Sequence, residues 1–300
     1  MSDSIKDQFL ANPIYYTENA HAALRERLIT VERIYAKDAP KFNHLFDWMA
    51  LAHEDLGLIA YFVRRDCAAL KQHWHLFSRL RVHAAHHEPD SESYTSGGSM
   101  SHERELLYAF ISDSSAAINE AVMLETPRLH RWRDDPKAAE FSFHLAQLVI
   151  RGDYEAAETK VVVGARKAGG QLKKSYATGT DFYSLLMKGD KAGLEASIMD
   201  YIKAEQKNTM PIVCDFIRPV STLRAKLCWH KGIPVEIEHP MVPKDWMPIE
   251  PLAHYDDIYD FLSPDWVPPN QGFISRLTRR FQKEFPTVDV SMERVRQIDR

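Results

Sequence analysis

Glycine and cysteine are both scarce in this sequence of 300 residues. The chain holds 12 glycines, few for an all-β protein or for one organised by glycine-rich loops. The three cysteines, Cys67, Cys214 and Cys228, are an odd number at wide spacing, so they predict neither a disulfide framework nor a zinc site. We therefore expect reduced, buried thiols.

Long apolar runs and an excess of positive charge are missing as well. No apolar run approaches the roughly 18 residues that a membrane-spanning helix requires. The N-terminus lacks the basic start and apolar core of a secretory signal. The net charge of −4 gives the whole molecule no positive field for nucleic acid. The sequence thus predicts a cytoplasmic protein that binds neither a membrane nor nucleic acid directly.

Motifs that carry catalysis are also not found. The chain contains no Gly-x-Ser-x-Gly elbow, Walker A string or Gly-x-Gly-x-x-Gly string. His83 and His87 have the i, i+4 spacing of helix-borne metal ligands. No His-Glu-x-x-His motif accompanies them, and we interpret them as polar residues near an exposed helix end. We assign no catalytic residue, metal ligand or cofactor, and we expect that the protein is not an enzyme.

Apolar residues recur at helical spacing along most of the chain. The stretches 24–35, 42–63 and 70–84 each carry one apolar stripe, the mark of an amphipathic helix. Further helices are expected at 180–188 and 190–206. The sequence predicts an all-α fold.

Four polar turns divide these helices, and each ends in a residue type that favours the first position before a helix. These residues are Asp66, Ser114, Asp153 and Asp190, which lie 48, 39 and 37 residues apart. That spacing is typical of helix–turn–helix units. We predict tandem helical hairpins, arranged as an α-solenoid-like array or an irregular bundle. Each of the four residues should begin a helix and accept a backbone N–H bond.

The chain after residue 210 changes in character. A helix over 211–231 is expected to bend at Pro219. Residues Ile233–Glu238 alternate as in a possible short strand, and the prolines from Pro240 to Pro251 predict an extended segment. A short helix is expected at 254–262.

The domain boundaries follow from composition. A polar loop at 88–101 has a Gly-Gly centre and is expected to separate two regions. We predict an N-terminal helical hairpin region (1–100), a helical-hairpin core (101–270) and a basic C-terminal helix or tail (271–300). Within that tail, a basic amphipathic helix is expected at 273–285.

Negative charge gathers in one segment. Residues 235–265 contain eight acidic residues and one lysine, a net charge of −7 against −4 for the whole chain. Aromatic side chains in a negative field are typical of a surface that binds a basic protein. An aromatic core segment with a solvated acidic face is the alternative, and both interpretations remain open. The candidate partner-binding residues are Trp246, Glu250, Tyr255, Asp256, Asp257, Tyr259 and Asp260.

Several motifs over residues 40–262 resemble those of bacterial immunity proteins of polymorphic toxin systems, of the immunity protein 49 type. The strings that carry the resemblance are Leu106–Asp113, Leu185–Asp190, Leu227–Gly232, Val235–Pro240, Leu252–Tyr255 and Tyr259–Leu262. The resemblance implies an all-helical inhibitor that neutralises a toxin delivered by a neighbouring cell, often through a type VI secretion system. It carries over no catalytic residues, because such proteins act by binding.

The absent signal further suggests a toxin that acts in the cytoplasm. A nuclease is one such toxin, since its basic face, which must bind phosphate, suits an acidic aromatic patch. The alternative function is a helical-repeat adaptor or scaffold that binds a protein partner without inhibiting it.

Overall fold

The structure is a computed structural model, and it describes residues 5–34, 43–87, 100–205, 212–263, 265–266, 272, 274, 277–278 and 281–300. The chain divides into two units. The first combines residues 1–99 with 252–300, and the second comprises residues 100–251. This division differs from the three regions expected from composition, because the segment after residue 251 packs with the N-terminal helices.

All regular structure in the described part of the chain is helical, and no strand occurs there. The predicted all-α fold of helical hairpins with an extended proline-rich segment is confirmed. Helical periodicity was sufficient for this prediction because each long helix buries one apolar stripe.

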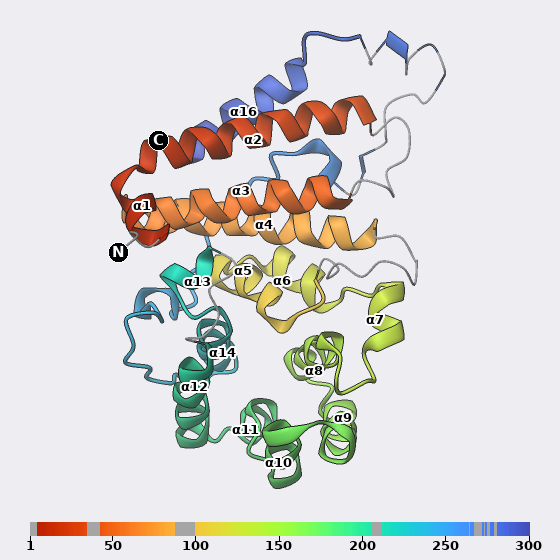
Figure 1. Ribbon diagram of the computed structural model, residues 1–300, viewed down its shortest axis with the longest axis vertical. Coiled ribbons are helices and arrows are strands. Elements are labelled where there is room, and N and C mark those ends of the chain that lie inside the picture. Colours follow the sequence, from red (N-terminus) through yellow and green to blue (C-terminus); the bar gives the residue numbers. More distant parts are fainter. Residues whose placement is uncertain are drawn as a thin grey trace. The chain divides into compact units, whose positions relative to one another are not determined.

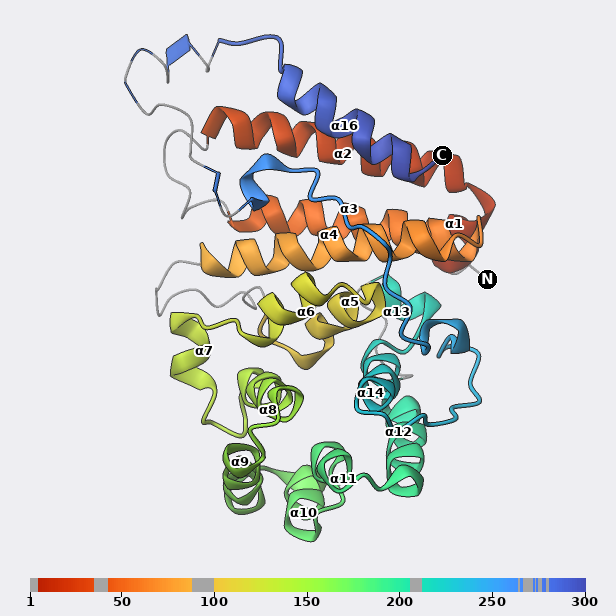
Figure 2. The same ribbon diagram turned by 180° about the vertical axis from the view of Figure 1, so that it is seen from behind.

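Three long helices of the first unit lie side by side, and a fourth runs along the first of them (Figures 1 and 2). Gly57 permits the close packing of α3 on α4, since a Cβ atom there would lie 2.5 Å from the Trp74 ring. The helices of this unit are α1 (Ile5–Ala11), α2 (Pro13–Ile34), α3 (Asn43–Phe62), α4 (Cys67–His86), the 3-10 helix η4 (Asp260–Leu262) and α16 (Pro286–Ile298).

The second unit is built from shorter helices. They are η2 (Glu103–Glu105), α5 (Leu106–Ser112), α6 (Ser115–Val122), α7 (Pro127–Trp132), α8 (Ala139–Arg151), α9 (Tyr154–Lys167), α10 (Gly170–Thr178), α11 (Phe182–Lys188), α12 (Lys191–Glu205), α13 (Val213–Phe216), α14 (Pro219–His230) and η3 (Lys244–Trp246).

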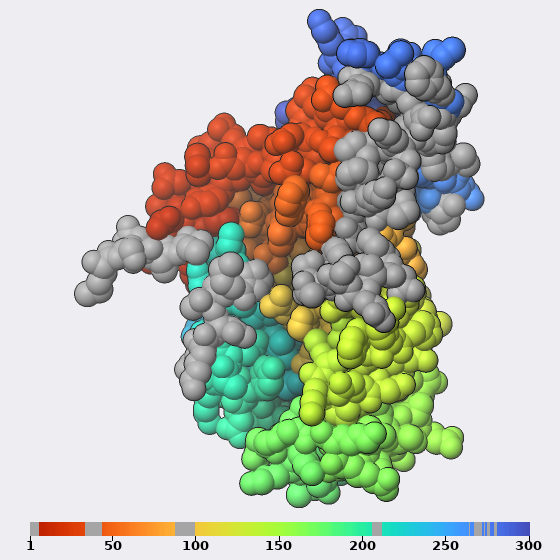
Figure 3. Space-filling model, turned by 45° about the vertical axis from the view of Figure 1, so that its right-hand side comes forward, coloured from red at the N-terminus to blue at the C-terminus, as the bar shows by residue number. Residues whose placement is uncertain are grey.

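Helices α8 to α12 and α14 of this unit follow one another around an open arc (Figures 1 and 2). The side chains of α9 to α11, green in the space-filling view, form one continuous surface (Figure 3). Gly164 on α9 lets α10 approach closely, because a Cβ atom there would lie 2.5 Å from the Tyr176 ring. The arc brings residues from distant parts of the sequence together around one cavity.

The four predicted turn residues all precede a helix, as expected. Asp66, Ser114 and Asp190 each accept a backbone N–H bond, from Ala69, Ala117 and Gly193. Asp153 does not, and this part of the prediction is wrong. Its carboxylate instead pairs with Arg151 at 2.9 Å, which turns the side chain away from the helix end.

Three predictions for the later chain are wrong. Pro219 does not bend a helix; it begins α14 after an extended break at Ile217, and a proline at the first helical position loses no hydrogen bond. Residues 233–238 form no strand. Their backbone groups bond to side chains, including Glu236 N to Glu195 and Val235 O to the Trp229 indole. Residues 254–262 carry no α-helix, and the 3-10 helix η4 is the one regular element among them.

Two further predictions fall largely outside the described residues, namely the polar loop at 88–101 and the basic helix at 273–285. Within the predicted basic helix, residues 274, 277 and 278 are helical, as expected, whereas residues 281–285 carry no helix. The C-terminal helix α16 begins only at Pro286. It is not basic, since it holds two acidic and two basic residues. All three cysteines are free, and Cys67 is only half-buried.

Candidate functional site

In the second unit, the extended segment that follows α14 is held by a buried ion pair. Lys226 on α14 is fully buried, and its Nζ lies 2.7 Å from Asp113 Oδ1. The same ammonium group donates to the carbonyl oxygens of Trp246 and Pro248, both at 2.8 Å. The other Asp113 oxygen accepts from the Glu250 backbone N–H at 3.1 Å. This pair therefore fixes the backbone across residues 246–250.

Trp246 and Glu250, the two candidate residues of this unit, have different surroundings. Trp246 is 2% exposed and belongs to the core, whereas Glu250 is exposed. Three other acids that follow α14, Glu236, Glu238 and Asp245, are also exposed. We call residues 236–250 with these four acids the acidic segment. Glu236 pairs with Lys191, and Glu238 with Lys244, but exposed pairs of this kind are weak.

The other candidate acids lie in the first unit, where two of them have internal partners. Asp257 Oδ1 lies 2.9 Å from His75 Nε2, and its other oxygen lies 3.4 Å from Arg79. Burial alone would raise the pKa of Asp257, but the hydrogen bond from His75 and the charge of Arg79 hold it below its ordinary value. Asp256 pairs with Arg294 of α16. These two carboxylates are therefore engaged in holding the unit together.

Of the remaining three, only Asp260 is well exposed. Tyr259 is 1% exposed, and its hydroxyl lies 2.7 Å from His53 Nε2. Tyr255 is half-buried against the His75 ring, with 5.0 Å between ring centroids. Trp246 and Tyr259 are thus core residues, as the alternative interpretation allowed. The seven candidates also do not share one unit.

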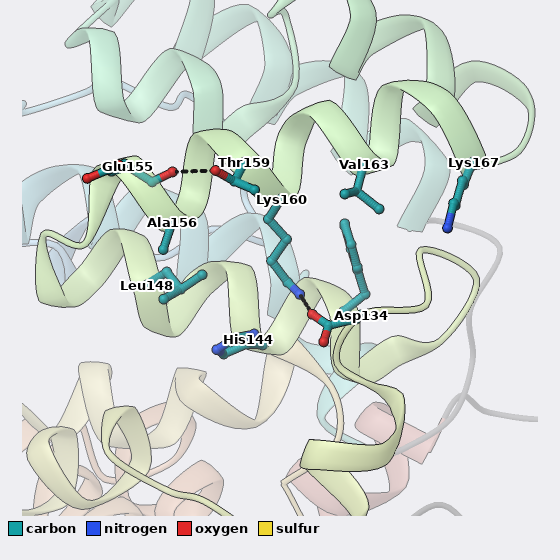
Figure 4. Close-up of a pocket in the computed structure, with 10 residues that line it drawn as sticks. Asp134, His144, Leu148, Glu155, Ala156, Thr159, Lys160, Val163 and Lys167 are labelled. Carbon is teal, nitrogen blue, oxygen red and sulfur yellow. Dashed lines mark hydrogen bonds and ion pairs between the residues drawn. The ribbon is translucent and has the colours of Figure 1, made fainter.

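A cavity of about 570 Å³ opens between α8 and α9 in the second unit. Ala156 on α9 points toward Leu148 on α8, and Lys160 extends past His144 to Asp134 (Figure 4). Lys160 is buried, and its Nζ lies 3.2 Å from Asp134 Oδ1. The same ammonium group bonds to the Arg133 carbonyl oxygen. Both partners belong to the loop after α7, so Lys160 anchors this loop to α9.

The charge balance in this cavity keeps its histidine neutral. Burial, followed by the positive charge of Lys160, lowers the pKa of His144 to about 4. Burial also lowers the pKa of Lys160, although Asp134 opposes the shift. The cavity is thus lined by a lysine that is paired with a carboxylate, by a neutral imidazole and by apolar side chains such as Leu148 and Val163. The contacts of Lys160 thus tie α9 to the loop after α7.

The histidine pair on α4 is packed within the first unit. The His83 ring contacts Phe46 edge-on at 4.6 Å between centroids, and His87 Nδ1 bonds to the His83 carbonyl oxygen at 2.9 Å. Burial lowers the pKa of His83 to about 3. Within the described part of the chain, no group of three or more His, Cys, Asp or Glu side chains could hold a metal ion.

Sequence reasoning missed the buried charges of the second unit, Lys160, Lys226 and Asp113. A signal for two of them exists in the helical periodicity. Lys160 occupies the buried stripe of α9 together with Ala157 and Gly164, and Lys226 lies among buried neighbours on α14. A lysine where the period calls for an apolar residue indicates a buried ion pair.

Comparisons with protein-family models, with curated proteins and with solved structures find no match. Among the helices described, none is long and apolar enough to cross a membrane.

Proposed function

We propose that the protein is an immunity protein, which binds and neutralises a cognate toxin effector of a contact-dependent or type VI secretion system. In this proposal the toxin acts in the cytoplasm and presents a basic face, as a nuclease does. The protein acts by binding and performs no reaction of its own. The resemblance of its motifs to immunity proteins of the immunity protein 49 type motivates the proposal.

The observation that best supports a binding function is the fixed backbone of the acidic segment. Lys226 and Asp113, which are paired with each other, hold residues 246–250 through four hydrogen bonds to backbone groups. Glu236 and Glu238 nonetheless expose 81% and 79% of their side chains. A surface that is ordered before binding loses less conformational entropy when a partner docks. Exposed acids on such a surface also steer a basic partner toward it.

This arrangement changes which residues are proposed to meet the toxin. Glu236, Glu238, Asp245 and Glu250 are the proposed contacts, because all four are exposed on the acidic segment. Trp246 supports that stretch from the core.

The direct test is toxin neutralisation in cells. The product of the neighbouring gene is expressed in bacteria with and without this protein, and growth is measured. We expect the product to be toxic alone, harmless with this protein, and bound to it in purified form. Binding without protection from toxicity would instead support a helical adaptor. A neighbouring product that is toxic but neither bound nor neutralised would contradict the proposal.

A further inference from the structure

The inner side of the arc in the second unit holds a cavity of about 620 Å³. Its lining comes from η2, α8, α10, α11, α12 and α14, so widely separated parts of the chain contribute to it. Its volume lies within the range of small-molecule and side-chain pockets. Three tyrosines, Tyr176, Tyr183 and Tyr201, face it together with Phe182.

One of the two arginines that line the cavity is paired with a carboxylate and with aromatic rings. Arg224 on α14 lies 2.7 Å from Glu103 Oε1, and the Tyr183 hydroxyl donates to the other Glu103 oxygen at 2.6 Å. The Arg224 guanidinium also lies 4.2 Å from the ring centroid of Tyr201 and 4.9 Å from that of Phe182. Arg224 is therefore not available to attract an anion.

A second carboxylate in the lining, that of Asp181, has a hydrogen-bond partner within the described part of the chain for only one of its two oxygens. Asp181 is 6% exposed, and its Oδ1 accepts the Ser184 backbone N–H at 3.0 Å. Its Oδ2 is buried and has no hydrogen-bond partner among the described residues. A buried carboxylate oxygen without a donor is costly. This oxygen thus provides an acceptor for a ligand that carries N–H groups.

Two carboxylates of the lining act on the Tyr176 hydroxyl. Burial raises the pKa of the Tyr176 hydroxyl, and the carboxylates of Asp181 and Glu103 raise it further, with Arg224 opposing them. Arg104, the other cation of the lining, lies 3.8 Å from Glu105. Aromatic rings beside a carboxylate are the usual surroundings of a bound ammonium or guanidinium group.

We infer that this cavity is a binding site for an organic cation, an alkylguanidinium or alkylammonium group, which would donate to Asp181 Oδ2 and stack on the tyrosines. The cation is either a free small molecule or a basic side chain of a protein partner. The inference does not rest on the proposed immunity function, since it concerns a cavity apart from the acidic segment.

The test uses agmatine, an alkylguanidinium that also carries a terminal ammonium group, and N-butylurea, a neutral compound with an alkyl chain of the same length. Each is titrated into the 300-residue chain by calorimetry. We expect saturable one-to-one binding of agmatine and none of N-butylurea. The key variant is Asp181→Asn, because asparagine caps a helix as well as aspartate does but removes the charge. It should weaken agmatine binding at least tenfold, with the fold checked by circular dichroism. The matched control, Asp200→Asn on the exposed side of α12, should bind as the parent does.

A blocked Gly-Arg-Gly tripeptide separates the two sources of the cation. Binding of the tripeptide at least as tight as that of agmatine indicates a partner's side chain. Binding of agmatine alone indicates a free small cation. The inference is overturned if agmatine shows no saturable binding up to ~10 mM, or if Asp181→Asn binds it as tightly as the parent.

Discussion

His53 and His73 are hydrogen-bonded to each other in the interior of the first unit, with 3.0 Å between their Nδ1 atoms. Both side chains are fully buried. His53 Nε2 is also hydrogen-bonded to the Tyr259 hydroxyl. On the other side, His73 Nε2 lies 3.4 Å from the Asp299 carboxylate near the C-terminus. A connected polar chain therefore joins α3, α4, the segment after residue 251 and the end of α16.

This chain predicts that the first unit loses stability in mild acid. Burial, and then the neighbouring His73, lower the pKa of His53 well below its ordinary value. The unfolded chain therefore binds a proton at His53 that the folded chain does not. The free energy of unfolding should be fully retained above pH ~6.5 and should fall as the pH drops below that value. Urea unfolding at a series of pH values, followed by circular dichroism, measures this.

The slope of the unfolding free energy against pH measures how many more protons the unfolded chain binds than the folded chain. Replacement of His53 by glutamine should lower this number by about one. His83 titrates with the same sign, so part of the dependence should remain. An unchanged slope in the His53→Gln variant would show that His53 is not the group responsible.

Two turn residues should differ in their contribution to stability. Asp66→Ala removes the hydrogen bond to the Ala69 N–H and should cost about 1 kcal/mol. Asp153→Ala removes no such bond, because Asp153 caps nothing with its side chain, and it should cost much less. Equal losses in thermal or urea unfolding would mean that the Asp153 carboxylate caps α9 in solution.

Lys226→Met should destabilise the second unit by about 3–5 kcal/mol, because it leaves the buried Asp113 carboxylate without its closest cation. Hydrogen exchange should become faster at the Glu250 amide, which bonds to Asp113. Lys203→Met on the exposed side of α12 is the control and should change neither quantity. If the Lys226 variant is as stable as the parent, the ion pair does not hold the acidic segment.

The long helices were predictable because their apolar stripes are local features of the sequence, as in α3 and α4. The path of residues 254–262 was not, since it depends on distant partners. The Asp256 backbone bonds in both directions to the Gln72 side chain, and Asp257 meets His75. The acidic composition of this stretch was visible in the sequence. Which of its acids are exposed and which are paired inside the unit depends on tertiary contacts. Amino-acid composition carries no information about such contacts.

Local sequence patterns also could not predict which residues line the cavity on the inner side of the arc. Glu103 and Arg224 are 121 positions apart in the sequence, and neither belongs to a recognisable motif. Only Asp181 could be anticipated, as a residue type that favours the start of a helix. The helix-capping role of Asp181 was therefore predictable. That its second carboxylate oxygen lacks a hydrogen-bond donor among the residues that the structure describes was not.

The central claim is that the acidic segment binds a basic toxin, and the association rate of the two proteins tests it most directly. The variant replaces Glu236, Glu238, Asp245 and Glu250 by their amides, and the matched control replaces four exposed acids elsewhere on the unit, Asp153, Glu155, Glu158 and Asp200. At low salt the variant should associate with the cognate toxin at least tenfold more slowly than the control, and the difference should shrink at high salt. Equal association rates for variant and control at low salt would contradict the account.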